Sequence, residues 1–158
     1  MPGIGQPAPD FELPNQDGQR IRLSHYRGQK VIVFVFPKAN TAGCNAQACG
    51  FRDEFPRFEE ANTVVLGVSA DSRETLKQWK QDKELPYDLL SDPDYVVQKA
   101  WGARGVSLLN VVVDIPLTMR SYWVIDENGV ITDMQVGTTP GSSVKKALDA
   151  VKATRTQV

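Results

Sequence analysis

The chain has 158 residues, of which 41% are hydrophobic and 23% are charged. These proportions are typical of a soluble globular protein and exclude disordered, collagen-like and coiled-coil classes. We expect residues 1–158 to form one domain, because a chain of this length can bury roughly 70% of its unfolded surface. Eighteen Lys and Arg residues nearly balance nineteen Asp and Glu residues, and the net charge of -1 argues against a nucleic-acid partner.

The cellular compartment is suggested by the N-terminus and by the cysteine count. The stretch from Met1 to Pro7 lacks the basic and apolar regions of a signal peptide. No stretch approaches the roughly 20 apolar residues of a membrane span. Two cysteines are too few for a disulfide-rich secreted protein. We therefore expect a cytoplasmic protein that does not contact membranes.

The first predicted elements are a hairpin and a buried strand. Phe11 to Leu13 and Ile21 to Leu23 alternate around Asn15 to Gly18, which predicts a small N-terminal β-hairpin. The run from Lys30 to Phe36 is apolar, β-branched and aromatic, and it stops at Pro37. This run predicts a buried central strand.

The middle of the chain alternates between helical and strand patterns. Apolar residues recur at helical spacing from Ala42 to Glu59, which predicts one long helix. Val64 to Val68 predicts a second buried strand, and Asp71 or Ser72 can cap the helix that follows it. A shorter helix is expected at about 95–101.

The C-terminal third predicts a hairpin and a helix. Ser121 to Ile125 and Val130 to Val136 flank Asn128 and Gly129, a dipeptide that favours a tight hairpin turn. Ser142 or Ser143 is expected to open the last helix. The order of elements along the chain predicts an α/β fold with a mixed central sheet and helices on both faces. A thioredoxin-like arrangement fits this order.

The segment with the most chemical information contains both cysteines, Cys44 and Cys49. It leaves the central strand and places Cys44 in the first turn of a helix, where free N–H groups and the helix dipole favour a thiolate. A free cysteine is often only a small buried hydrophobe. The second cysteine and the strand-to-helix junction together favour a nucleophile instead.

Other kinds of site have weaker support. Two cysteines and the single histidine, His25, are too few for a structural zinc site, and His25 is expected on the surface or in a turn. Ser69 lacks the second glycine of a hydrolase nucleophile elbow. No phosphate-cradling loop or dinucleotide motif is present. We therefore expect no bound metal or cofactor.

The pattern Pro37-x-x-x-Thr41-x-x-Cys44 resembles the active-site motif of peroxiredoxins. Cys49 and Leu89-Leu-Ser-Asp-Pro93 are similar to the bacterioferritin-comigratory, or Q-type, subgroup of that family. The resemblance extends from Pro7 to the last helix and implies a thioredoxin-like fold. It also implies a thiol peroxidase that reduces hydrogen peroxide and organic hydroperoxides.

The resemblance implies a role for each of five residues. Cys44 would attack the peroxide and become a sulfenic acid, and Cys49 would resolve it as an intramolecular disulfide. Thr41 would orient the peroxide, although it can also cap the helix. Arg120 would stabilise the thiolate and the developing charge, and Pro37 would shield the pocket from water. Thioredoxin or a similar dithiol is the implied reductant, and a monomer is expected, with a weak dimer as the alternative.

The chain departs from the subgroup pattern in two places and leaves one segment unassigned. Ala42 stands where the family often has proline, and Tyr122-Trp123 stands where it often has a Thr-Phe pair. The apolar stretch within 103–116 is compatible with a pocket wall, a partner surface or ordinary core.

Two other functions stay open from the sequence. A general thiol–disulfide oxidoreductase would use the same activated cysteine on protein disulfides. A non-enzymatic interaction domain would have unreactive thiols.

Overall fold

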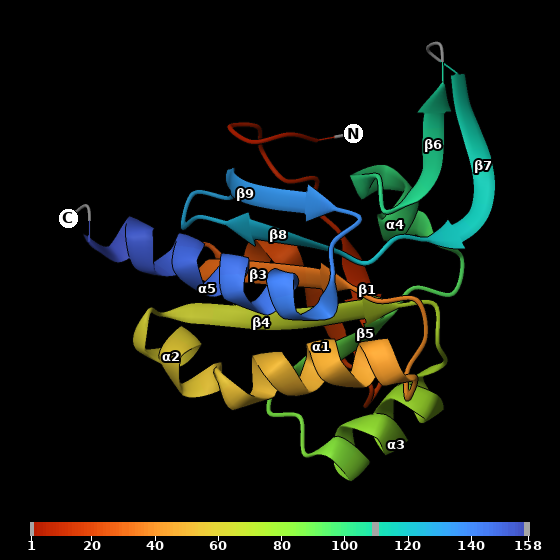
Figure 1. The fold of residues 1–158 in the computed structure, drawn as a ribbon, viewed down its shortest axis with the longest axis horizontal. Coiled ribbons are helices and arrows are strands. Elements are labelled where there is room, and N and C mark those ends of the chain that lie inside the picture. The colour runs from red at the N-terminus through yellow and green to blue at the C-terminus, as the bar shows by residue number, and fades with distance from the viewer. Residues whose placement is uncertain (1, 109–110, 157–158) are drawn as a thin grey trace.

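The computed structural model describes residues 2–108 and 111–156, with side chains left out at 105–117 and 153–156. A five-stranded mixed sheet with the order β5-β4-β3-β8-β9 forms its centre (Figure 1). Strands β3, β4 and β5 are mutually parallel, and β8 and β9 extend the sheet with antiparallel pairing. The five strands have the bounds β3 Lys30–Val35, β4 Thr63–Ser69, β5 Asp88–Ser91, β8 Ser121–Ile125 and β9 Ile131–Val136. The predicted mixed α/β sheet is confirmed.

Strand β3 lies in the middle of the sheet, and its side chains enter two separate cores. Val31, Val33 and Val35 belong to the core on one face of the sheet. Ile32, Phe34 and the following Phe36 belong to the core on the other face. Successive side chains of a strand point to opposite faces, so a continuous apolar run is required where both faces are covered.

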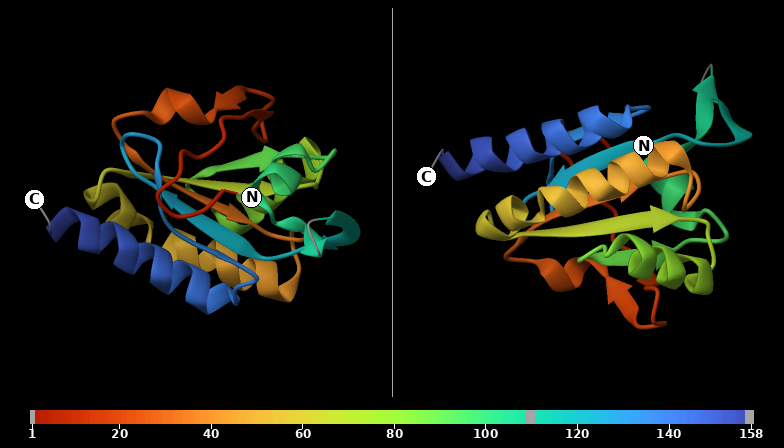
Figure 2. Two further views of the ribbon diagram at one scale, coloured as in Figure 1. Left: turned by 90° about the horizontal axis from the view of Figure 1, so that it is seen from above. Right: turned by 60° about the horizontal axis from the view of Figure 1, so that its bottom comes forward.

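Helices cover both faces of the sheet, as the sequence predicts. Four of them contribute side chains to the Phe34 core: α1 Ala42–Asp53, α2 Phe55–Glu60, α3 Arg73–Lys83 and α5 Pro140–Thr156. The opposite core receives α4 Val96–Trp101, the 3₁₀ turn η1 Leu23–Tyr26 and the N-terminal hairpin. Figure 2 shows the N-terminal segment on the side of the sheet away from α1 and α5.

The single helix expected over 42–59 is wrong, because the chain forms α1 and α2 with a break at Glu54. Pro56 is the cause. Its nitrogen carries no hydrogen, and its ring would clash with the carbonyl of Arg52 in a continuous helix. Proline is tolerated at the start of a helix, where Pro56 lies in α2.

The last helix also begins earlier than expected, at Pro140 instead of Ser142 or Ser143. Thr139 accepts a hydrogen bond from the Ser142 amide at 3.3 Å, so its hydroxyl satisfies a free amide in the first turn. The Ser143 hydroxyl donates to the Pro140 carbonyl inside the helix.

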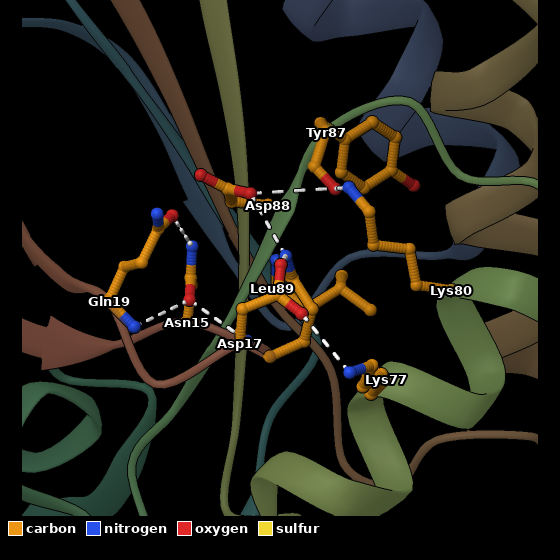
Figure 3. Close-up of polar contacts among 9 residues, drawn as sticks. Asn15, Asp17, Gln19, Lys77, Lys80, Tyr87, Asp88 and Leu89 are labelled. Carbon is orange, nitrogen blue, oxygen red and sulfur yellow. Dashed lines mark hydrogen bonds and ion pairs between the residues drawn. The ribbon is translucent and has the colours of Figure 1, made fainter.

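The N-terminal hairpin, β1 Glu12–Pro14 and β2 Arg20–Arg22, is fastened to β5 and α3 through its loop (Figure 3). The buried Gln16 side chain accepts a hydrogen bond from the Leu89 amide and donates to the Asp88 carboxylate. Asp17 forms an ion pair with Lys77 of α3, with 3.6 Å between the charged atoms. These contacts link the hairpin loop to both β5 and α3.

The apolar 103–116 stretch forms a ribbon that is separate from the central sheet. Strands β6 Arg104–Leu108 and β7 Val111–Thr118 pair only with each other in the described sheets and project from the body (Figure 1). The Met119 amide donates to the Ala103 carbonyl at 2.7 Å, which closes the base of the ribbon. The backbone therefore excludes a strand of the central sheet, and the side chains of 105–117 lie outside those described.

Candidate active site

The site lies where β3 ends and α1 begins, and the intervening loop is held by Asp71. The Asp71 carboxylate accepts hydrogen bonds from the Ala39 amide at 2.7 Å and from the Ser69 hydroxyl at 2.8 Å. Asn40 adopts a left-handed conformation with φ of 59°. The loop thus turns sharply and starts α1 at Ala42.

Cys44 is the third residue of α1, so its side chain lies in the first helical turn as predicted. It is 1% exposed and belongs to the core that contains Phe36 and Ala48. The Arg120 Nη2 atom donates a hydrogen bond to the Cys44 sulfur at 3.4 Å. The helix start and the guanidinium therefore both present positive electrostatic potential to the sulfur.

Arg120 is positioned by a residue that the sequence analysis missed. The Arg120 Nη1 atom donates to Gln47 Oε1 at 2.6 Å, and the Gln47 side chain is fully buried. Gln47 lies one helical turn after Cys44, so the two side chains share a face of α1. A polar residue three positions after Cys44, on a helical face that is otherwise buried, was the sequence signal that could have identified Gln47.

Gly43 leaves the room that the guanidinium needs. A Cβ atom at this position would lie 2.8 Å from Arg120 Nη2, the atom that donates to Cys44. Any side chain at Gly43 would therefore displace the group that contacts the sulfur.

Thr41 and Pro37 lie close to Cys44 in the chain, and Thr41 differs from one expectation. Thr41 occupies the N-cap position of α1, yet its hydroxyl donates to the Lys38 carbonyl at 2.8 Å instead of capping the helix. Pro37 directly follows Phe36 and is exposed to solvent. Both residues are exposed, and the structure shows no hydrogen bond from either of them to Cys44 or Arg120 among the described residues.

Cys49 lies on α1, half-buried, and both cysteines are free thiols. In a regular helix, Cα atoms five residues apart are separated by roughly 8.6 Å, and their side chains diverge by about 140° around the axis. A disulfide usually requires less than ~7 Å between Cα atoms. The two cysteines cannot bond while α1 keeps its helical form.

The described part of the chain offers no alternative site for metal chemistry. Among residues 2–108 and 111–156, no group of three or more His, Cys, Asp or Glu side chains is arranged to hold a metal ion. His25 is exposed within η1, as expected. Within the same residues, no helix is both long and apolar enough to cross a membrane.

Comparison with known proteins decides the family. The AhpC/TSA family model matches residues 4–134. A relative named as a peroxiredoxin in Mycobacterium tuberculosis is 40% identical over 142 residues, which cover 90% of each chain. This chain belongs to the AhpC/TSA family. A second relative, named as the peroxiredoxin Bcp of Coxiella burnetii, is 39% identical over 82% of this chain and 85% of its own.

Solved structures agree with the sequence comparison. The structure of a protein named peroxidoxin BcpB from M. tuberculosis superposes with a TM-score of 0.85 at 30% identity. The match covers 97% of this chain and 98% of the other. The resemblance to the Bcp/Q subgroup and the thioredoxin-like fold are both confirmed.

Proposed function

We propose that this member of the AhpC/TSA family is a thiol-dependent peroxidase that uses Cys44 to reduce hydrogen peroxide and organic hydroperoxides. The observation that carries the proposal is the hydrogen bond from Arg120 to the buried Cys44 sulfur at the start of α1. The names of the peroxiredoxin relatives support the same activity. A peroxide substrate and a thiol reductant follow from that assignment.

In the first step the Cys44 thiolate attacks one peroxide oxygen and the O–O bond breaks. Cys44 becomes a sulfenic acid, and the second oxygen leaves as water or an alcohol after taking a proton. Arg120 is placed to stabilise the negative charge that develops on the reacting oxygens. Thr41, at the N-cap of α1, would orient the peroxide, and Pro37 would restrict the entry of water.

In the second step the Cys49 thiol attacks the Cys44 sulfenic acid. A disulfide forms and water is released. A dithiol of the thioredoxin kind would then reduce the disulfide and restore both thiols. The two thiols of this chain and the external dithiol supply this chemistry, so the proposal includes no bound cofactor.

The proposal includes a cytoplasmic location, one domain over residues 1–158 and a monomeric state. The cytoplasmic location is supported by the chemistry of the proposed disulfide. A disulfide that must be reduced in every turnover needs a reducing compartment, and such a compartment maintains dithiol reductants.

A general thiol–disulfide oxidoreductase fits the geometry less well. Such an enzyme must bring its nucleophile into contact with a disulfide on another protein, whereas the Cys44 side chain is 1% exposed. A small peroxide needs far less access. The Arg120 guanidinium beside the sulfur can also stabilise negative charge on an oxygen atom. Disulfide exchange generates no such charge.

Cys49→Ser tests the two-step assignment. Without a resolving thiol, the variant should consume about one equivalent of hydrogen peroxide per chain and then stop, because the sulfenic acid has no internal partner. Intact mass should show the addition of one oxygen to Cys44. Wild type should turn over repeatedly with thioredoxin and its reductase, and insulin reduction by wild type without peroxide consumption would establish the rival function.

Disulfide formation should unwind α1, because the helix keeps the two sulfurs apart. We expect amide hydrogen exchange across 45–52 to be faster in the disulfide form than in the reduced form, since unwinding removes helical hydrogen bonds. Mass spectrometry would first confirm the Cys44–Cys49 bond. Equal protection in both forms would contradict the unwinding and leave the peroxidase assignment intact.

A further inference from the structure

Strand β4 is longer than its neighbour β5, which leaves part of one edge of β4 unpaired. The β4–β5 ladder begins where Leu66 lies opposite Asp88, whereas β4 itself begins at Thr63. Pro86, two positions before Asp88, has no N–H to donate and favours the end of a strand. In the described sheets, residues 63–65 therefore pair with β3 on one side and with no strand on the other. We call this part of β4 the open edge.

Thr63 and Val65 direct backbone groups towards the open edge. Successive residues of a strand inside a parallel sheet bond alternately to the strands on its two sides. The Val68 carbonyl accepts an amide hydrogen bond on the β3 side, and the Ser69 carbonyl accepts one on the β5 side. Odd-numbered residues of β4 therefore face the β5 side. Within the described part of the chain, no hydrogen bond occupies the Thr63 amide, the Thr63 carbonyl or the Val65 amide.

The open edge borders a cleft of about 420 Å³ between α2, β4 and the start of β5. Ligand sites typically occupy about 300–1,000 Å³, so the cleft has room for a short segment of chain. Figure 1 shows α2 beside the start of β4, at the end of the sheet away from the start of α1. The cleft and Cys44 therefore lie at opposite ends of the sheet.

One wall of the cleft combines an aromatic ring with a carboxylate. Phe55 and Glu59 both line it and lie four residues apart on α2, so they share a face of that helix. The Phe55 ring packs on the buried Tyr87 ring, with 6.2 Å between ring centroids. Glu59 is exposed and forms no ion pair with another described residue.

The charge of the cleft is negative. Two of its lining residues, Glu59 and Asp88, are acidic, and no Lys or Arg lines it among the described residues. Lys80 approaches Asp88 from the side of α3, with 4.0 Å between the charged atoms (Figure 3). Glu59 is therefore the carboxylate that is left to attract a positively charged ligand.

We propose that the open edge is a docking site for an extended, basic peptide segment of a partner protein. The segment pairs its backbone with Thr63 and Val65, in the way that a strand adds to the edge of a sheet. A Lys or Arg side chain of the segment packs its aliphatic stem on Phe55 and brings its charge to Glu59. Docking there involves neither thiol, so the inference goes beyond the proposed function and leaves the Cys44 site accessible.

The peptide acetyl-Thr-Val-Lys-Val-Thr-amide is a suitable probe for the open edge. In an NMR titration of the reduced full-length protein, the Thr63 and Val65 amides should shift saturably. Both amides should also exchange more slowly with solvent in the complex, because new hydrogen bonds protect them. The same peptide with N-methylated backbone amides should not bind, since it has lost its donors. A peptide with Glu in place of Lys should bind about two- to tenfold more weakly.

Glu59→Gln tests the charge of the cleft, and Glu60→Gln is its matched control. Both variants replace an exposed carboxylate of α2 with an amide of the same shape, but only Glu59 lines the cleft. Glu59→Gln should weaken binding of the Lys peptide about two- to fivefold, which is the range of an exposed ion pair. Glu60→Gln should leave the affinity close to that of wild type. Added salt should reduce the difference between the two variants.

The outcomes decide both the site and its occupant. Saturable shifts at Thr63 and Val65 that require the peptide N–H groups, with weaker binding in Glu59→Gln alone, would support the inference. No saturable shift at millimolar peptide, equal binding of the N-methylated peptide, or equal affinity for the Lys and Glu peptides would overturn it. Shifts of the same amides on dilution of the protein alone would assign the edge to a second copy and would also overturn it. A wild type that does not react with peroxide would refute the proposed function without affecting these results.

Discussion

Cys44→Ser should consume no hydrogen peroxide above the uncatalysed background, because a serine hydroxyl at this position has no thiolate to attack the O–O bond. The replacement is nearly isosteric, so the site should keep its shape. Cys44 is 1% exposed in an apolar core, and burial of a hydroxyl there should cost about 1–3 kcal/mol of unfolding free energy. Cys44→Ala avoids that polar group and should be equally inactive.

The measurement is peroxide consumption under a thioredoxin system, with intact mass of the protein before and after exposure. Cys49→Ser serves as the matched control, because it makes the same change on the same helix and should still react once. Reduced samples should show similar circular dichroism and urea midpoints. Peroxide consumption by folded Cys44→Ser at the wild-type rate would eliminate Cys44 as the nucleophile.

Arg120→Ala should lower the second-order rate constant for peroxide reduction by about 10²–10³-fold. That is the typical loss when one preorganised donor to a developing negative charge is removed. The structure places the lost donor 3.4 Å from the sulfur, with its second nitrogen held by Gln47. The variant also leaves the buried Gln47 amide without its partner, which should cost about 1–3 kcal/mol of stability.

Two further variants separate charge from position. Arg120→Lys keeps the charge but loses the fork that reaches both Gln47 and Cys44, so a partial loss of rate is expected. Gln47→Leu keeps Arg120 but removes its acceptor, and it should also reduce the rate partially. Stopped-flow measurement of sulfenic acid formation would report these effects. An unchanged rate constant in folded Arg120→Ala would limit Arg120 to a structural role.

Much of the fold was predictable because its signals are local. The run from Lys30 to Phe36 is apolar at every position, which only a strand covered on both faces requires. Asn128 and Gly129 specify their turn by their own conformational preferences, and the structure places that turn between β8 and β9.

The errors arose where one local signal competed with another. The phenylalanines over 42–59 keep helical spacing through Pro56, and that periodicity masked the break at Glu54. The ribbon of β6 and β7 contains the same aliphatic residues as a central strand. Its pairing therefore depends on tertiary context, which composition does not encode.

The residues of the site also divide into those that the local sequence indicates and those that it does not. Cys44 and its helix start were visible in the segment itself, and the contact with Arg120, 76 residues away, followed only from family resemblance. Gln47 carries no motif. Its importance comes from its hydrogen bond with Arg120, which lies 73 residues away in the sequence.

The closed base of the ribbon has a consequence for how this protein tolerates change. The chain leaves the body at Ala103 and returns at Met119, where the two backbones are bonded at 2.7 Å, and Arg120 comes next. The entropy cost of closing a loop grows only slowly with its length. We therefore expect an insertion or deletion beyond this hydrogen bond to change the ribbon more than the position of the Arg120 guanidinium. The ribbon is therefore the segment in which we expect new sequence to be inserted with the least effect on the site.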